Sequence, residues 1–221
     1  MARNPKDSPE GRLLAGLIAL KLDPSLADPL LKYLGELVIW NKAYSLTAVR
    51  EPAEMVTRHV LDSLAVLPFV SGLVLDVGSG AGLPGLPLAI ADPRLHVTLM
   101  DSNGKKARFL RHAQRQLALN NVDVAETRAE DFRPAVPYGA IVSRAFGPLR
   151  DFLETTAHLG AANGQWLAMK GKLDSDELKG LPAGFQIMST PRLEVPGLAE
   201  DRHLVILSLS PQPSALSPVS P

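Results

Sequence analysis

The 221-residue sequence contains no cysteine, and this absence excludes several kinds of chemistry. A chain without thiols has no disulfide, no thiolate metal site and no cysteine nucleophile. The sequence also has only five histidines, which are scattered without the spacing of metal ligands. We therefore expect no metal site.

Long apolar runs are also missing. No run reaches the ~18 residues that a membrane-spanning helix needs. The polar start of the chain, residues 1–6, leads into no secretory apolar core with a small-residue cleavage site. We expect a cytoplasmic protein with no membrane partner.

The sequence has no formal net charge, because 23 lysines and arginines balance 23 aspartates and glutamates. This balance does not indicate a nucleic-acid binder, so any nucleic-acid surface must be a local patch. The acid-free segment 102–122 contains cations that recur at helical spacing on one face, namely Arg108, Arg111, His112 and Arg115. A solvated face and a phosphate-contacting face both fit this pattern.

The most informative stretch present is residues 73–85, LVLDVGSGAGLPG. Its first five residues are mostly branched and apolar, which predicts a buried parallel strand over 73–77. A glycine turn and a helical pattern follow. This order forms nucleotide sites in open α/β sheets, because glycine lets the backbone approach a ligand and the helix start offers unpaired N–H groups.

Two classes of cofactor fit this turn. Residues 80–85 match the dinucleotide fingerprint G-x-G-x-x-G, which is a weak signal alone. Asp76 favours the other class, because its carboxylate would repel a pyrophosphate and attract the sulfonium and amino groups of S-adenosylmethionine. Asp76 also starts the form D-x-G-x-G-x-G, shown by S-adenosylmethionine enzymes, which makes Gly78 and Gly80 candidate cofactor residues. A tight turn with no ligand and a helix-capping aspartate is the remaining alternative.

A second acid lies at the spacing expected of a nucleotide site. Asp101 ends a predicted strand over residues 95–100. An acidic residue at this distance beyond the glycine turn accepts hydrogen bonds from ribose hydroxyls. Asp101 is therefore a candidate ribose ligand.

The whole chain divides into three parts. Apolar stripes at helical spacing predict a helical cap over residues 1–65, of which residues 1–11 are expected to be frayed. Alternating strand and helix patterns predict a doubly wound α/β domain over residues 66–210. Residues 211–221 contain proline and serine throughout and are expected to be disordered.

Within the first part, Ser25 is expected to cap a long helix, residues 41–50 to form a loop, and Glu51-Pro52 to start the next helix. In the second part the predicted strands are residues 73–77, 95–100, 122–126, 140–142, 165–169, 185–189 and 204–209, of which the last two could be antiparallel. The predicted helices there are residues 84–91, 104–118 and 148–159.

Cations follow two of these strands at the edge that holds the glycine turn. Arg144 ends the fourth strand, where it could bind the cofactor or an RNA phosphate; an ion pair with Asp151 or Glu154 is the alternative. Lys170 ends the fifth strand. Both are candidates for contact with a ligand at this edge.

Three further residues are candidates from their position in the predicted fold. Arg58 and His59 lie where the helical cap would lean on the same edge, although a lone histidine is more often structural than catalytic. Together with Lys170 they are candidates for RNA placement. Ala129-Glu130 follows the third strand, at a turn that in this geometry usually lies against the adenine; a helix-start acid is the alternative.

Two absences limit which atoms a methyltransferase with this sequence could methylate. Without cysteine, C5 of a pyrimidine cannot be methylated by the usual covalent route. No Asn/Asp-Pro-Pro-Tyr/Phe motif occurs, so the arrangement that methylates exocyclic amines is missing. The N7 of guanine suits such a site, because it carries a lone pair and no proton and needs only in-line placement against the methyl sulfonium.

Several segments together resemble the bacterial 16S ribosomal RNA guanine-N7 methyltransferase G family, also called glucose-inhibited division protein B. The segments lie in order between residues 26 and 172 and are Trp40-Asn41, Leu46–Ala48, Arg58–Leu64, Asp76–Gly85, Asp101–Lys106, Ser143–Phe146 and Lys170-Gly171. The G-L-P-G ending and the H-x-L-D-S block are more specific than a glycine loop. Family members carry asparagine where this chain has Ser45.

The resemblance implies a Rossmann-like class I S-adenosylmethionine-dependent methyltransferase fold, with a mostly parallel seven-stranded sheet and an N-terminal helical extension. It implies methyl transfer from S-adenosylmethionine to N7 of guanine 527 in 16S rRNA of the small ribosomal subunit or of an assembly intermediate. It also implies cofactor contacts, which map onto Gly78, Leu83, Ala129, Glu130 and Arg144. We expect a monomer.

Two other hypotheses stay open. An NAD(P)-dependent oxidoreductase would use the register of residues 80–85, but Asp76 and the absence of a Tyr-x-x-x-Lys pair count against it. A non-catalytic RNA-binding or ribosome-binding protein would retain only a relic site. The intact acids and glycines count against that hypothesis.

Overall fold

The computed structural model describes residues 8–144 and 146–210; the tail over residues 211–221, for which we expect disorder, lies outside the described residues. Within them, seven strands form one sheet in the order β3-β2-β1-β4-β5-β7-β6. β7 runs antiparallel to both of its neighbours, and the other paired strands are parallel. The strands are β1 (Leu73–Val77), β2 (His96–Met100), β3 (Val122–Ala125), β4 (Tyr138–Arg144), β5 (Gly160–Lys170), β6 (Phe185–Ser189) and β7 (His203–Leu209). The prediction of a mostly parallel seven-stranded α/β sheet is confirmed.

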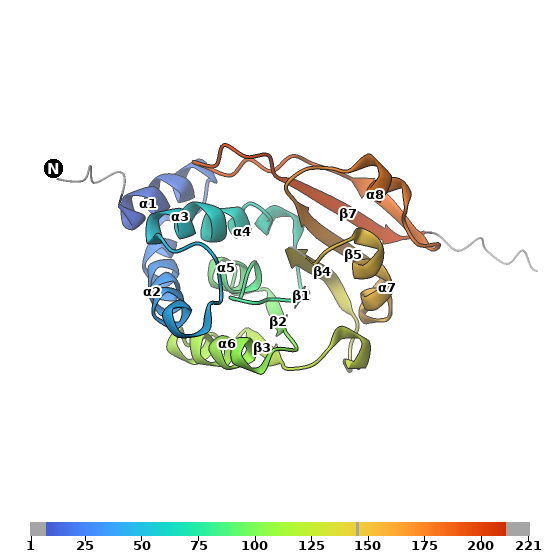
Figure 1. Cartoon of the computed structure of the whole chain (residues 1–221), viewed down its shortest axis with the longest axis horizontal. Coiled ribbons are helices and arrows are strands. Elements are labelled where there is room, and N and C mark those ends of the chain that lie inside the picture. Colours follow the sequence, from blue (N-terminus) through green and yellow to red (C-terminus); the bar gives the residue numbers. More distant parts are fainter. Residues whose placement is uncertain (1–7, 145, 211–221) are drawn as a thin grey trace, which may run out of the picture.

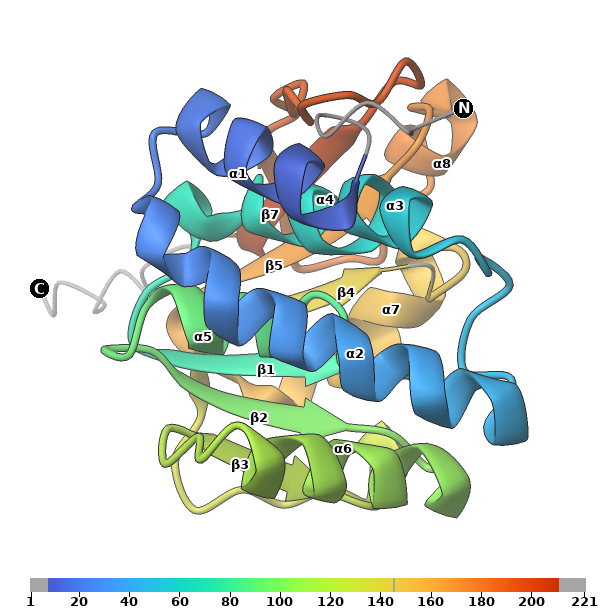
Figure 2. The same cartoon turned by 90° about the vertical axis from the view of Figure 1, so that its left-hand side faces the viewer.

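Helices cover both faces of this sheet (Figures 1 and 2). They are α1 (Pro9–Ala19), α2 (Ala27–Tyr44), α3 (Pro52–Met55), α4 (Asp62–Leu64), α5 (Gly85–Ala91), α6 (Gly104–Gln116), α7 (Leu149–Thr156) and α8 (Ser175–Lys179). A π-helical segment, Val56–Leu61, joins α3 to α4. Helix α3 begins at Pro52 as predicted, whereas α8 was not predicted.

The first two helical segments begin at short polar side chains. Helix α1 begins at Pro9, with Ser8 Oγ accepting a hydrogen bond from Gly11 N at 3.0 Å. This part of the segment expected to be frayed is therefore helical. Asp23 caps the short 3₁₀ turn before α2 by accepting a hydrogen bond from Ser25 N at 2.8 Å. The expectation that Ser25 is the cap is therefore wrong, because its backbone N–H is the group being capped.

Helix α2 continues further than predicted, into the segment expected to be a loop. The rings of Trp40 and Tyr44, one turn apart, stack with their centroids 5.2 Å apart, and Trp40 also contacts Phe109 of α6. This packing extends the helix to Tyr44, and Ser45 ends it with a φ of +50°. The loop therefore starts after residue 44.

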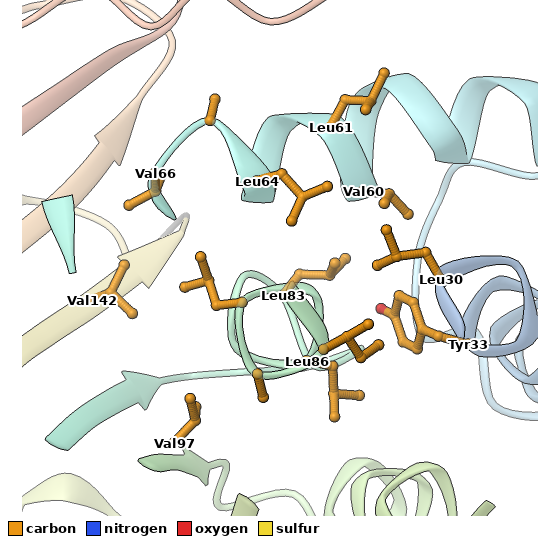
Figure 3. Packing of buried hydrophobic residues seen from close by; sticks show 14 of the residues in the cluster. Leu30, Tyr33, Val60, Leu61, Leu64, Val66, Leu83, Leu86, Val97 and Val142 are labelled. Carbon is orange, nitrogen blue, oxygen red and sulfur yellow. The ribbon is translucent and has the colours of Figure 1, made fainter. Parts of the chain in front are cut away.

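One hydrophobic core joins the N-terminal helices to the sheet (Figure 3). Figure 3 shows Tyr33 of α2 beside Leu86 of α5, with Leu64 of α4 above Leu83. Every labelled side chain is at most 3 % exposed. Because this core also contains β-strand residues such as Val97 and Val142, the N-terminal helices and one face of the sheet share a single core.

The opposite face of the sheet has its own core, built around α7. Successive residues of a strand point to opposite faces, so Val74 joins the first core and Leu75 the second. The second core includes Phe152 of α7 and Trp166 of β5. Both faces of the central strands are thus buried, as expected of parallel strands that read as apolar runs.

The strand register aligns the carboxyl ends of the parallel strands at one edge. Val77 of β1 pairs with Met100 of β2, which pairs with Ala125 of β3. On the other side, Arg144 of β4 pairs with Met169 of β5. The loops that follow these strands therefore meet at the same edge, where open α/β sheets bind ligands.

Candidate cofactor site

A cavity of about 360 Å³ lies at the carboxyl edge of the sheet. Its volume is within the range of ligand pockets, roughly 300–1,000 Å³. Its walls come from the ends of β1, β2 and β4, the turn after β3, and α7; they are formed by Val77, Gly78, Met100, Asp101, Ser102, Lys106, Thr127, Arg128, Ala129, Glu130, Arg144, Phe146 and Thr155. Five residues predicted from the sequence are among them, namely Gly78, Asp101, Ala129, Glu130 and Arg144.

The glycine turn is fastened to the end of β2 by backbone hydrogen bonds. Both Gly78 N and Ser79 N donate to Met100 O at 2.9 Å. Gly80 N donates to Asp101 Oδ2 at 3.0 Å. Gly78 and Gly80 have φ angles of +72° and +58°, which residues with a Cβ rarely adopt. The turn thus requires glycine, and Gly80 acts by holding Asp101 rather than by lining the cavity.

Asp101 lies in the cavity wall with both carboxylate oxygens already fixed. Its Oδ1 accepts a hydrogen bond from Asn103 N at 2.9 Å, Oδ2 accepts one from Gly80 N, and Lys106 Nζ lies 3.5 Å from Oδ2. A carboxylate offers about four lone-pair sites, so these bonds orient it and leave sites for hydroxyl donors. Asp101 can therefore accept hydrogen bonds from a diol.

Asp76 does not line the cavity, although the sequence suggests a direct cofactor contact. Its side chain is fully buried, and Oδ2 accepts a hydrogen bond from Gly85 N at 2.9 Å. A Cβ on Gly85 would lie 2.7 Å from this oxygen. Asp76 therefore holds the start of α5 against the end of β1, and only glycine at position 85 permits that approach.

Burial raises the pKa of Asp76 to about 7, against the opposing effect of the Gly85 N–H hydrogen bond. Its Oδ1 is buried without a hydrogen-bond partner among the described residues. Since the ordinary value is 3.8, the folded protein holds this proton in a pH range where the unfolded chain has lost it. Stability is then lost as the pH rises from about 4 to about 7.

We expect Asp76→Asn to remove this pH dependence. The free energy of unfolding of the variant minus that of wild type should be about 2–3 kcal/mol larger at pH 8 than at pH 5, because only wild type must ionise a buried carboxyl group. Urea unfolding followed by tryptophan fluorescence at both pH values measures this difference. A difference that is the same at pH 5 and pH 8 would contradict the protonated, buried carboxyl.

Leu83 also lies outside the cavity wall. Its side chain is 3 % exposed and packs between α5 and α4 in the first core (Figure 3). A cofactor contact through this side chain is therefore not what the structure shows. The leucine anchors the glycine turn to the N-terminal helices instead.

Arg144 lines the cavity and has an acidic partner that the sequence did not indicate. Its NH1 donates to Arg58 O at 3.0 Å and lies 3.5 Å from Asp62 Oδ2. The expected alternative partners, Asp151 and Glu154, do not pair with it. The ion-pair partner Asp62 belongs to α4, which is far from β4 in the sequence, so the sequence alone cannot reveal this contact.

His59 is buried and held in the neutral state. Its Nε2 lies 2.7 Å from Thr47 Oγ1, and its Nδ1 lies 3.4 Å from Arg144 NH1. Burial, with a further effect from Arg144, lowers the pKa of His59 to about 4. A neutral ring that is 6 % exposed is not a phosphate ligand, so its expected role in placing RNA is not supported by the structure.

The other two candidates for RNA placement are engaged in ion pairs. Arg58 NH2 lies 2.5 Å from Glu200 Oε1, and both side chains are about half exposed. Lys170 Nζ lies 2.7 Å from Glu177 Oε1 and donates to Gly147 O at 2.8 Å. Neither residue lines the cavity, although the backbone carbonyl of Arg58 accepts a hydrogen bond from Arg144.

Phe146 and Thr155 also line the cavity, although the sequence predicts no role for either residue. The ring of Phe146 lies 5.5 Å from that of Phe152 of α7 and would be 3.9 Å from a Cβ on Gly78. A large aromatic residue two positions after a strand end is a signal for Phe146. Thr155 gives no such signal, because its place depends on how α7 packs.

Among residues 8–144 and 146–210, no group of three or more histidines and acids could hold a metal ion. In the same part of the chain, no helix combines the length and apolarity required to cross a bilayer.

Solved structures share the fold of this chain. A glycopeptide N-methyltransferase, MtfA, in complex with S-adenosylmethionine matches 67 % of this chain and 94 % of its own, with a TM-score of 0.54 and 14 % identity. TrmN from Thermus thermophilus matches 67 % of this chain and 48 % of its own, with a TM-score of 0.52 and 22 % identity. At these identities the match shows a methyltransferase-like fold and no more.

Sequence comparison is more specific. The profile of a family described as rRNA small subunit methyltransferase G matches residues 27–205. A protein of Ectopseudomonas mendocina named ribosomal RNA small subunit methyltransferase G is 52 % identical over 196 residues, covering 87 % of this chain and 92 % of that protein. One of Stenotrophomonas maltophilia with the same name is 53 % identical over 194 residues, covering 87 % and 92 %. This chain therefore belongs to the rRNA small subunit methyltransferase G family.

Proposed function

We propose that this protein transfers a methyl group from S-adenosylmethionine to N7 of a guanine in 16S rRNA, which by the family resemblance is guanine 527. The observation that carries the proposal is the cavity at the carboxyl edge of the sheet, where Gly78, Asp101, Ala129, Glu130 and Arg144 meet. Family membership supports the reaction class, because the relatives are named as methyltransferases of small-subunit rRNA.

The chemistry of the cavity wall fits the proposed cofactor. The fixed carboxylate of Asp101 is placed to accept hydrogen bonds from two ribose hydroxyls. Because Gly78 has no Cβ, the cofactor could approach its backbone closely at the end of β1. Ala129-Glu130 would lie against the adenine. Arg144 contributes a guanidinium to the same cavity. These residues would hold the nucleoside and orient the remainder of the cofactor.

The site also fits a methyl acceptor that needs no general base to remove a proton. When bound, S-adenosylmethionine supplies a methyl group on a sulfonium, which the lone pair of guanine N7 can accept without losing a proton. His59 lies outside the cavity wall and is buried, so it is not placed to remove a proton from an acceptor. The protein then contributes positioning rather than general base catalysis.

Methyl transfer to small-subunit RNA tests the proposal. RNA or subunits from a strain that lacks this gene should accept one methyl group, and mapping should place it on guanine N7. Calorimetry should show binding of S-adenosylhomocysteine and none of NADH. Binding of NADH alone would favour the oxidoreductase, and cofactor binding without methyl transfer to any form of the RNA would favour a non-catalytic binder.

Helix α6 supplies the best candidates for contact with RNA phosphates. Lys105 and Arg108 are exposed and have no ion-pair partner within the described residues, and α6 begins at the cavity, where Lys106 lines the wall. By contrast, Arg111 pairs with Glu126 at 2.7 Å. We therefore propose that the first two turns of α6 contact RNA, rather than its whole cationic face.

We expect Arg108→Ala to weaken RNA binding and to lower the slope of log affinity against log salt by about 1, because one phosphate contact is lost. Filter binding at several salt concentrations measures this slope. Arg94→Ala is the matched control, since Arg94 is exposed and its ion pair is with Asp92, in the loop before β2 and away from the cavity. Equal slopes for wild type and Arg108→Ala would contradict the proposal that α6 contacts RNA phosphates.

A further inference from the structure

A buried carboxylate, that of Asp62, lies between two arginines from distant parts of the chain. Asp62 begins α4, and its side chain is 3 % exposed. Its Oδ1 accepts a hydrogen bond from Arg202 Nε at 3.1 Å, and its Oδ2 lies 3.5 Å from Arg144 NH1. A buried charge is costly unless it is paired; burial raises the pKa of Asp62, and each of the two arginines acts against that rise.

The two arginines connect different regions of the fold. Arg144 ends β4 and lines the cofactor cavity, whereas Arg202 directly precedes β7. The connection between β6 and β7 passes over the N-terminal helices, as both views of the fold show (Figures 1 and 2), and contributes Leu193 and Val195 to the first core. Asp62 therefore joins the cavity wall to a segment that covers the helices.

The contacts of Arg144 with residues 58–62 all involve a single guanidinium nitrogen, NH1. NH1 donates to Arg58 O at 3.0 Å, and lies 3.4 Å from His59 Nδ1 and 3.5 Å from Asp62 Oδ2. The guanidinium is planar, so fixing one nitrogen on three acceptors restricts the orientation of the whole group. Nε and NH2 have no hydrogen-bond partner among the described residues, and Arg144 lines the cavity, so these nitrogens are available to a ligand.

The protonation of His59 is consistent with this arrangement. For Nδ1 to accept a hydrogen bond from Arg144, the ring proton must be on Nε2, where it points at Thr47 Oγ1 at 2.7 Å. Thr47 N in turn donates to Asn41 Oδ1 at 2.8 Å, so the orientation of the ring is fixed from the end of α2. Among the three acceptors around NH1, Asp62 alone is a carboxylate, and it therefore makes the strongest electrostatic contribution.

We propose that Asp62 is a positioning residue for methyl transfer, which holds the guanidinium of Arg144 against the cavity so that it can contact the cofactor. This inference rests on the proposed function for the identity of the cofactor. The competing account is that Asp62 only joins α4 to the segment before β7 through Arg202. The two accounts differ in which arginine matters for ligand binding.

A comparison of Asp62→Asn with Arg202→Met separates them. Asp62→Asn keeps the shape of the side chain and should raise the Kd of S-adenosylhomocysteine and the KM of S-adenosylmethionine roughly tenfold, with kcat changed by less than about twofold. Arg202→Met should leave both constants within about twofold of wild type. In an Arg144→Ala background, Asp62→Asn should cause no further loss, because the group it positions is gone.

A second measurement does not depend on the cofactor. In the free wild-type protein, NMR should show hindered rotation of the Arg144 guanidinium, and this hindrance should disappear in Asp62→Asn but persist in Arg202→Met. If wild type binds no S-adenosylhomocysteine, the proposed function fails, while the NMR comparison still decides whether Asp62 orders Arg144.

Two results would overturn the inference. One is unchanged Arg144 rotation in folded Asp62→Asn. The other is a loss of affinity that is additive with Arg144→Ala or equal in Arg202→Met. Should Asp62→Asn fail to fold, Asp62→Glu serves the same comparisons, because it keeps the charge and displaces the carboxylate from NH1.

Discussion

Asp101→Asn should weaken the binding of S-adenosylhomocysteine by about 100-fold and abolish methyl transfer at micromolar cofactor. An amide has one acceptor oxygen in place of two, and the backbone N–H groups of Gly80 and Asn103 already use both carboxylate oxygens. The variant therefore loses either a ribose contact or a bond that holds the glycine turn, and hydrogen bonds to a charged group are each worth about 1.5–3 kcal/mol. Isothermal titration calorimetry measures the affinity directly.

Asp123→Asn is the matched control for this substitution. Asp123 lies in β3 of the same sheet and is exposed, with its carboxylate 2.7 Å from His96 Nε2 and away from the cavity. Its replacement should leave the affinity for S-adenosylhomocysteine unchanged. If Asp101→Asn bound the ligand as tightly as wild type while remaining folded, Asp101 would have no part in the cofactor site.

Tyr33→Ala should give the largest loss of stability, about 3–5 kcal/mol, which is the usual cost of deleting a fully buried aromatic side chain. Tyr33 is 0 % exposed, and its hydroxyl donates to Ala81 O in the glycine turn at 2.8 Å. The side chain thus joins α2 to the turn that forms the cavity (Figure 3). Urea unfolding measures the loss, and an unfolding free energy within 1 kcal/mol of wild type would contradict it.

Tyr33→Phe separates packing from the hydrogen bond. This variant keeps the ring and leaves Ala81 O without its donor, which should cost about 1–3 kcal/mol. Because the bond holds the glycine turn, we expect a weaker affinity for S-adenosylhomocysteine as well. An affinity equal to that of wild type would show that the turn is held by the bonds from β2 alone.

Several strands could be predicted because they are short apolar runs; β1 is followed directly by Gly78 and β2 by Asp101. β1 occupies the predicted residues 73–77, and β6 the predicted residues 185–189. β5 extends further back than predicted, to Gly160, whose backbone pairs with Tyr138 of β4 beyond an irregularity in the register; residues 160–164 are small or polar. Backbone pairing leaves no apolar pattern in the sequence, so such extensions are not visible there.

The cofactor candidates were predictable because they follow strand ends, and the strand register brings those ends together. Their individual roles were less predictable. Asp76 and Gly80 have the spacing of ligands, yet one holds the start of α5 and the other holds Asp101. Contacts between distant segments, such as Asp62 with Arg144, depend on tertiary packing that no local pattern encodes.

The central claim is that the cavity at the carboxyl edge of the sheet holds the methyl donor. A crystal structure of the protein with S-adenosylhomocysteine tests it most directly. We predict ribose hydroxyls on the carboxylate of Asp101, the adenine beside Ala129 and Glu130, and the guanidinium of Arg144 in contact with the ligand. A ligand bound elsewhere, or a cavity filled by the protein's own side chains in the presence of saturating ligand, would contradict the claim.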